Sequence, residues 1–117
     1  MKEVRKVIHK GKEILIIEYA GSKPDRMIEI LDEAKRLMQT DRKCVLVLSI
    51  FGKNYITPAF MRHLEKEVLK IENSIEKNAV MGLTEVQKWL LKGINAWYKR
   101  PLFHFDSYDE ALNFLVE

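Results

Sequence analysis

Residues 79–116 read AVMGLTEVQKWLLKGINAWYKRPLFHFDSYDEALNFLV and contain a strand–helix–strand–helix unit with almost no connecting sequence. The apolar run that ends at Gly82 and the later run LFHFD predict two strands. Thr84 and Ser107 are each followed three residues later by Gln or Glu, the pattern of a capping box that begins a helix. Strands joined by a helix lie parallel in one sheet, so the loops that follow them share one edge.

The remaining sequence adds three strands and two helices. The turn around Gly11 joins the first two strands as a hairpin, and residues 73–78 are expected to be a polar connector. The predicted strands cover residues 4–8, 14–20, 44–50, 79–82 and 102–105, and the predicted helices begin near Pro24, Pro58, Thr84 and Ser107. The order β-β-α-β-α-β-α-β-α predicts a single α/β domain over residues 1–117. Its mixed, mostly parallel five-stranded sheet would be covered by about four helices.

Length and composition place the chain among ordinary folded proteins. Its 117 residues fit one domain, and 47% are hydrophobic and 32% charged. The net charge of +3 is too small to indicate nucleic acid by itself. No apolar run approaches the length of a membrane span, and the start MKEVRKV lacks the apolar segment of a signal peptide. We therefore expect a cytoplasmic protein.

Cys44 is the one cysteine in the sequence. An intrachain disulfide and a cysteine-based zinc site are therefore excluded. Because Cys44 begins the apolar run CVLVLSI, we expect a buried thiol without a reactive role.

The element order resembles that of the STAS domain of bacterial anti-sigma-factor antagonists, which has the SpoIIAA-like fold. It is more similar still to small stand-alone SpoIIAA-like proteins grouped with the STAS and CRAL-TRIO lipid-transfer proteins. The residues that carry the resemblance are HKGKEILIIEYAG at 9–21, AVMGLTEVQKWLLKGINAW at 79–97 and LFHFDSYDEALNFL at 102–115. The resemblance implies a non-enzymatic regulatory module that binds a protein partner and needs no cofactor.

STAS antagonists carry a phosphorylatable Ser in an Asp-Ser-Ser-Gly loop at the start of the helix after the third strand. The corresponding residues here, 52–60, read GKNYITPAF, and Thr57 is the one hydroxyl at the helix start. Thr57 is therefore the candidate phosphorylation site that the resemblance implies. The Asp, the paired Ser and the Gly of the motif are missing, so we favour Thr57 as a plain N-cap.

The predicted interaction surface is the edge at which the loops after the third and fourth strands meet. Residues 51–57 and 82–88 should lie together there, since parallel strands end at the same edge. The candidate binding residues are Phe51, Lys53, Asn54, Tyr55, Thr57, Thr84 and Lys88. Free N–H groups at the helix starts favour an anion, although ordinary capping with solvated lysines is the simpler interpretation. The opposite edge, with connectors 40–43 and 76–78, is expected to be merely solvated.

A second hypothesis is a carrier or sensor of a small acyl or anionic ligand. An apolar pocket between sheet and helices would be lined by Phe51, Tyr55, Ile56, Phe60, Trp89 and Trp97. A closed core that packs the same side chains is the competing interpretation. The lysines and aromatic residues of 77–100 also fit a nucleic-acid surface. Core packing of those aromatic residues is the simpler account, so nucleic acid is not expected.

An enzyme is not expected, and a hydrolase or transferase with an unrecognised site is the third and least favoured hypothesis. His9, His63 and His104 do not share metal-ligand spacing, and no Ser–His–acid or paired-carboxylate motif is present. We expect His104 to be a half-buried structural residue that points away from the neighbouring phenylalanines. GxGxxG and Walker loops are also missing from the sequence, so no catalytic, metal or cofactor residue is assigned.

Overall fold

The computed structural model describes residues 2–40, 44–96 and 101–117. The strands are β1 (Val4–His9), β2 (Lys12–Glu18), β3 (Val45–Ile50), β4 (Ile75–Met81) and β5 (Leu102–Phe105). The helices are α1 (Pro24–Thr40), α2 (Pro58–Ile71), α3 (Glu85–Asn95) and α4 (Tyr108–Val116), with a single 3₁₀ turn (Glu72–Ser74) between α2 and β4.

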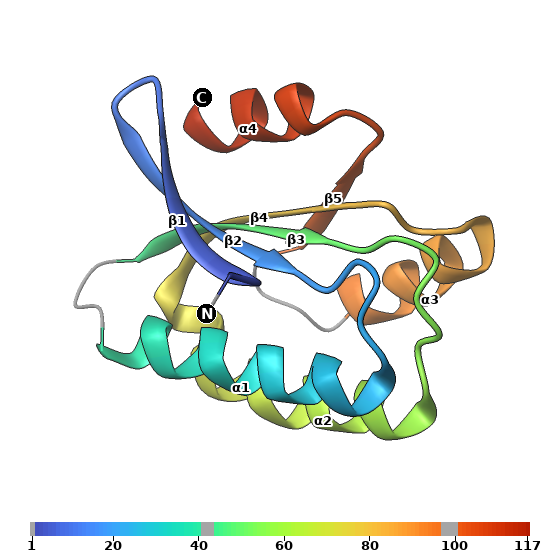
Figure 1. Ribbon diagram of the computed structural model, residues 1–117. Helices are drawn as coiled ribbons and strands as arrows, with labels where there is room; N and C mark the ends of the chain where they lie inside the picture. The colour runs from blue at the N-terminus through green and yellow to red at the C-terminus, as the bar shows by residue number, and fades with distance from the viewer. Residues whose placement is uncertain (1, 41–43, 97–100) are drawn as a thin grey trace.

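The strands form one five-stranded sheet in the order β1-β2-β3-β4-β5. The β1–β2 pair is antiparallel, and β2, β3, β4 and β5 are mutually parallel. Each helical crossover moves one strand further in the same direction, so α1, α2 and α3 fall on one face. Helix α4 returns across the other face and contacts all five strands (Figure 1). This architecture confirms the predicted fold class and element order.

Strand β2 has a continuous apolar run, Ile14 to Ile17, because both of its faces are covered by helices. Leu15 and Ile17 belong to the core under α1 and α2, whereas Ile14 and Ile16 belong to the core under α4. All four side chains are buried. A strand covered on both faces needs apolar residues at every position, not at alternate ones.

The predicted helix starts are confirmed by their hydrogen bonds. Thr57 Oγ1 and Ser107 Oγ each accept a bond from the backbone N–H three residues later, at 3.0 and 3.4 Å. Thr84 Oγ1 accepts from the Gln87 N–H at 3.2 Å, and the Thr84 N–H donates to Gln87 Oε1 at 3.0 Å. The capping box that opens α3 is therefore complete in both directions.

Strand β4 begins at Ile75, whereas the sequence predicted a solvated connector there. Ile75 is buried and pairs with Val45 of β3. Lys77 lies with its Nζ 4.9 Å from the ring centroid of Phe114 and donates to the backbone carbonyl of Phe114 at 3.1 Å. Asn78 is buried on the opposite face. The prediction of a solvated connector was wrong for Lys77 and Asn78, which lie in β4 and are partly or fully buried, whereas Glu76 is exposed as expected.

The prediction of a buried Cys44 was also wrong. Cys44 is exposed and precedes the first residue of β3, and its Sγ donates a hydrogen bond to the carbonyl of Asn73 at 3.5 Å. The apolar run enters the sheet one residue later than the sequence suggested.

Replacing Thr84 with alanine should lower the free energy of unfolding by about 1 kcal/mol, because α3 loses its N-cap. Urea denaturation at neutral pH measures the change. Thr40→Ala is a matched control, since the Thr40 hydroxyl only donates to the Leu37 carbonyl at the exposed end of α1. An unchanged midpoint for Thr84→Ala would contradict the capping role.

Helices α1 and α2 are joined by an ion pair that should make stability depend on pH. Lys35 Nζ lies 2.5 Å from Glu67 Oε2, and the hydrogen bond from Lys35 holds the pKa of the buried Glu67 below its ordinary value of 4.5. A carboxyl with a lowered folded-state pKa stabilises the protein above its unfolded pKa, and this contribution is lost as the pH falls through the folded pKa.

We therefore expect Glu67→Gln to be less stable than the wild type at pH 7, with a difference that shrinks as the pH falls below about 4.5. Unfolding midpoints measured across that range test this. Glu29→Gln, at an exposed position of α1, is the control. A Glu67→Gln deficit that does not change with pH would show that the carboxylate charge is not what stabilises the contact.

Candidate functional site

The loops after β2, β3 and β4 meet at the carboxyl edge of the parallel strands. The Tyr19 N–H donates to the Ile50 carbonyl and the Phe51 N–H to the Met81 carbonyl, both at 2.8 Å. Gly82 has φ +83°, and a Cβ there would lie 1.6 Å from the Phe51 carbonyl oxygen. The contact requires glycine. The predicted meeting of loops 51–57 and 82–88 is thus observed.

Asn54 is the centre of this loop cluster. Its Nδ2 donates to the backbone carbonyls of Tyr19 at 2.8 Å and Ser22 at 2.9 Å, and its Oδ1 accepts from the Gly52 N–H at 2.9 Å. Its own backbone carbonyl accepts a 2.8 Å bond from Gln87 Nε2. One asparagine therefore links the loops after β2 and β3 to the first turn of α3.

The predicted binding residues fall into two groups. Asn54 is buried, Thr57 and Thr84 are engaged as caps, and Phe51 stacks on the buried Tyr19 ring at a centroid distance of 4.8 Å. The side chains left at the surface are Lys53, Tyr55 and the partly buried Lys88, whose Nζ lies 3.2 Å from Glu85 Oε1. The first group shapes the edge, and the second group is what the edge presents to solvent.

The structure contradicts the expectation that Trp89 belongs to the core, whereas Trp97 and Tyr98 lie outside the described residues. Val86 and Trp89 are each 72% exposed, whereas Gln87 is buried. Gln87 turns inward because its amide is satisfied by Thr84 and by the Asn54 carbonyl. Lys92 Nζ lies 4.9 Å from the centroid of the Trp89 ring, a cation–π contact at the surface.

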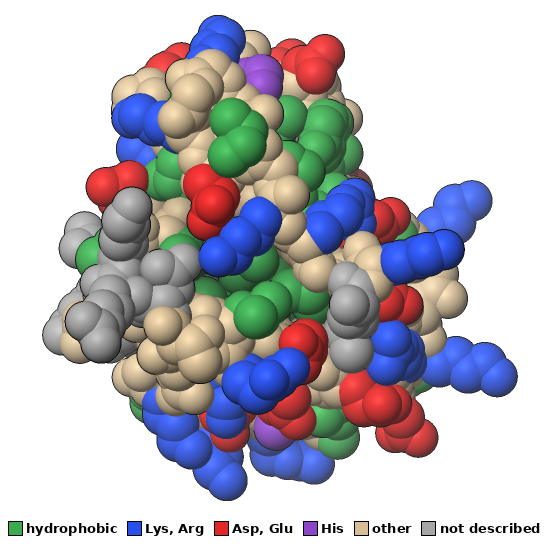
Figure 2. All heavy atoms as spheres, turned by 60° about the vertical axis from the view of Figure 1, so that its left-hand side comes forward, with side chains coloured by type: hydrophobic (Ala, Val, Ile, Leu, Met, Phe, Trp, Pro, Cys, Tyr) green, Lys and Arg blue, Asp and Glu red, His purple; other side chains and the backbone are tan. Residues whose placement is uncertain are grey.

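The side of the molecule at which β3 begins carries charged side chains of both signs (Figure 2). Figure 2 brings forward the left-hand side of Figure 1, where β3 begins, and shows basic and acidic side chains interspersed over it. Mixed charge of this kind is typical of a solvated surface.

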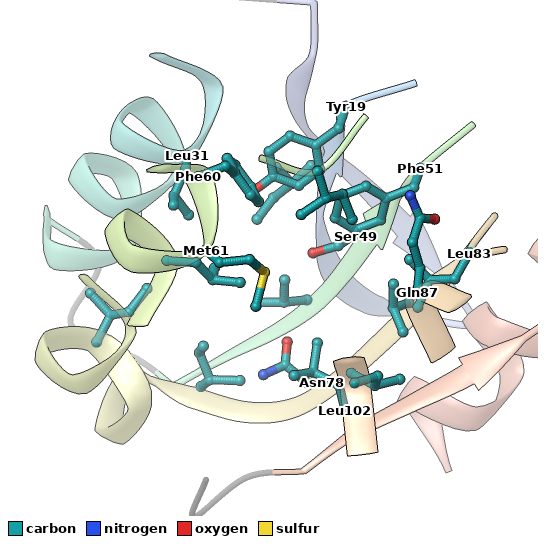
Figure 3. A pocket seen from close by; sticks show the side chains of 18 of the residues that line it. Tyr19, Leu31, Ser49, Phe51, Phe60, Met61, Asn78, Leu83, Gln87 and Leu102 are labelled. Atoms are coloured by element: carbon teal, nitrogen blue, oxygen red, sulfur yellow. The ribbon is translucent and has the colours of Figure 1, made fainter. Parts of the chain in front are cut away.

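An apolar cavity of about 80 Å³ lies between the sheet and the helices α1, α2 and α3. Phe51, Ile56 and Phe60 line it, as the carrier hypothesis predicted. The prediction that Tyr55 and Trp89 line the cavity was wrong, because both side chains are exposed to solvent. Trp97 lies outside the described residues. The lining also includes the polar side chains of Ser49 and Asn78, which the sequence did not single out (Figure 3).

The histidines lie in three separate environments. His9 Nε2 is 2.8 Å from Asn113 Oδ1, and His63 Nε2 is 2.6 Å from Asp32 Oδ1. The His104 side chain is largely buried, as expected, and its Nε2 has no hydrogen-bond partner in the described part of the chain. Burial lowers the pKa of His104, and the charge of Lys88 lowers it further. The neutral imidazole is therefore favoured at neutral pH.

Within residues 2–40, 44–96 and 101–117, no three His, Cys, Asp or Glu side chains are arranged to hold a metal ion. No helix in these ranges has the length and hydropathy needed to cross a bilayer.

Comparison with known proteins gives a likeness in fold. No family model matches the chain, and no curated protein matches it. Among solved structures, it is similar to an uncharacterised protein of the DUF3478 family from Shewanella loihica PV-4 with a SpoIIAA-like fold. The sequences are 16% identical, the match covers 96% of this chain and 91% of that one, and the TM-score is 0.65. The chain therefore has a SpoIIAA-like fold, as its order of strands and helices predicted.

Proposed function

We propose that this chain is a non-enzymatic regulatory module of the STAS type that binds a protein partner through the edge next to α3. This edge, called here the α3 edge, consists of Lys53, Tyr55, Val86, Trp89 and Lys92. The observation that carries the proposal is the exposure of its apolar side chains, 73% for Tyr55 and 72% for both Val86 and Trp89.

The exposed apolar side chains lie on α3 and on the loop that is hydrogen-bonded to it. Val86 and Trp89 are three residues apart on α3 and so share one face of the helix. Tyr55 directly follows Asn54, whose carbonyl is bonded to the Gln87 side chain. Tyrosine and tryptophan are the side chains that most often anchor a protein interface, because they bury a large area with few rotatable bonds.

The α3 edge is held in place before any partner arrives. The loop that carries Lys53 and Tyr55 is fixed by the hydrogen bonds of Asn54, and α3 is fixed by the capping box of Thr84 and Gln87. A surface that is already ordered loses less conformational entropy on binding, so more of the contact energy appears as affinity.

The charges around this edge indicate the chemistry of the partner. Lys53, Lys88 and Lys92 lie in or beside it, and Glu85 is the acidic residue of the first turn of α3. A complementary partner would offer an apolar recess for Trp89 with acidic groups at its rim.

Thr57 is not needed as a switch in this proposal. Its Oγ1 already accepts the Phe60 N–H at 3.0 Å, and phosphorylation would have to replace that cap. A phosphate at this helix start would still be tolerated by the helix dipole. Binding through the α3 edge should therefore be measurable with the unmodified protein.

The test begins with a partner captured from the native cell and then purified. We expect Trp89→Ala and Tyr55→Ala each to weaken its binding at least tenfold in calorimetry, as truncation of an interface anchor does. Both side chains are exposed, so the unfolding midpoints should change little.

Leu69→Ala is the matched control, because Leu69 is an exposed apolar residue on α2. It should bind like the wild type. Full binding by Trp89→Ala and Tyr55→Ala, with binding lost instead when Leu69 or residues at the amino ends of the strands are changed, would place the interface elsewhere and contradict the proposal.

A further inference from the structure

Strand β5 turns alternate side chains to opposite faces of the sheet, and this places His104 under α3. Phe103 and Phe105 pack on the Phe114 ring of α4, with centroid distances of 5.1 and 5.0 Å. Leu102 and His104 therefore face the other side of the sheet, on which α3 lies (Figure 1). The His104 ring is thus enclosed between β5 and α3.

The imidazole of His104 is buried with one nitrogen unpaired. Its side chain is 15% exposed, and its Nε2 is shielded from solvent and has no hydrogen-bond partner among the described residues. Its Nδ1 lies 3.8 Å from Oδ1 of Asp106. A protonated imidazole carries an N–H on both nitrogens, so the Nε2–H would be buried without an acceptor. A charged ring is therefore costly while α3 stays packed on β5.

The charged groups around the ring do not compensate for this cost. Helix α3 contributes Lys88 and Glu85, Asp106 follows β5, and the β4 residue paired with His104 is the apolar Val80. Burial lowers the pKa of His104 most, the charge of Lys88 lowers it further, and the two carboxylates oppose these effects more weakly. Both carboxylates are 89% exposed, so solvent screens their attraction for a cation on the ring.

Helix α3 is held to the sheet by few buried side chains. Of its described side chains, Gln87 alone is fully buried, whereas α1 buries five. Hydrogen bonds hold its two ends. Gln87 donates to the Asn54 carbonyl, and Asn95 accepts from the Leu102 N–H at 2.8 Å and donates to the Leu102 carbonyl at 2.9 Å. An element with little buried surface opens at a smaller free-energy cost than the sheet that it covers.

We propose that protonation of His104 releases α3 from β5, so that mildly acidic conditions remove the α3 edge as a binding surface. Once α3 has moved away, water reaches the ring and both N–H groups find acceptors. The released ring then has its ordinary pKa of 6.5, so it binds a proton more readily than the packed ring does. Opening takes up this proton, so it becomes more favourable as the pH falls below that value and does not depend on pH well above it.

The release of α3 concerns the free protein and needs no partner. Its consequence for binding rests on the function proposed above, because Val86, Trp89 and Lys92 of the α3 edge move with the helix. A partner that binds the packed helix excludes the proton from His104. Its affinity should therefore fall once the pH is below the value at which His104 of the free protein titrates.

Amide hydrogen exchange at about pH 7 and about pH 5.5, corrected for the intrinsic exchange rate, measures the opening of α3 in the free protein. One linked proton should lower the protection of the amides from Trp89 to Asn95 about threefold to eightfold between these two pH values. The amides of β3 should be more strongly protected than those of α3 at both pH values, because the helix opens apart from the sheet.

His104→Phe keeps a ring of similar size that cannot take up a proton, so the effect of pH on the protection of α3 should disappear. His104→Gln, which is polar and always neutral, supplies the same comparison if the phenylalanine variant does not fold. His63→Gln is the matched control. The Nε2 of His63 lies on α2, 2.6 Å from Oδ1 of Asp32, and its loss should leave the pH dependence of α3 unchanged.

Equal protection of α3 at the two pH values in the wild-type protein would overturn the proposal. So would a full pH dependence in the His104 variants, since another group would then take up the proton. A single level of protection shared by α3 and β3 would also overturn it, because the helix would then open only together with the whole fold. None of these outcomes involves the partner, so loss of the partner proposal alone would leave the release of α3 standing.

Discussion

The hydrogen bonds of Asn54 are the interactions on which the rest of this structure depends. It closes its own loop through Gly52 and ties that loop to the carbonyls of Tyr19 and Ser22. The same residue accepts the Gln87 amide through its backbone carbonyl. The polar atoms of the Asn54 amide are satisfied inside the protein. Three connections, each of which follows a parallel strand, therefore behave as one unit.

This unit also sets the rotation of α3. Gln87 must face inward to reach both Asn54 and Thr84, and the residues on either side of it in the helix then face outward. Val86 and Trp89 become exposed for this reason, although both are apolar. A polar network in the interior thus produces an apolar patch at the surface, where it is available to a partner.

The sequence predicted those parts of the fold that are determined locally. Thr84 and Ser107 cap their helices as predicted, because a hydroxyl at the N-cap interacts only with its own helix. The parallel arrangement of the later strands followed from the helical crossovers that join them. The meeting of two loops at one edge followed from the direction of parallel strands.

The predictions that were wrong concern residues whose burial is determined by contacts between distant parts of the sequence. Asn78 is polar and was assigned to a solvated connector, yet it lies in β4 and faces the cavity. Trp89 is apolar and was assigned to the core, yet Gln87 takes the inward position. In both cases hydropathy predicted the opposite of the observed burial. Only the sheet register and the Asn54 network identify the buried residue.

Amide hydrogen exchange tests the central role of Asn54 most directly. In the wild-type protein the N–H groups of Gly52, Phe51 and Tyr19 should be strongly protected. In Asn54→Ala, protection should fall together at all three and at the first turn of α3, while the amides of β1 and β2 that pair in the hairpin remain protected. Loss of protection confined to residues 51–57, with the loop after β2 and the start of α3 unchanged, would contradict this account.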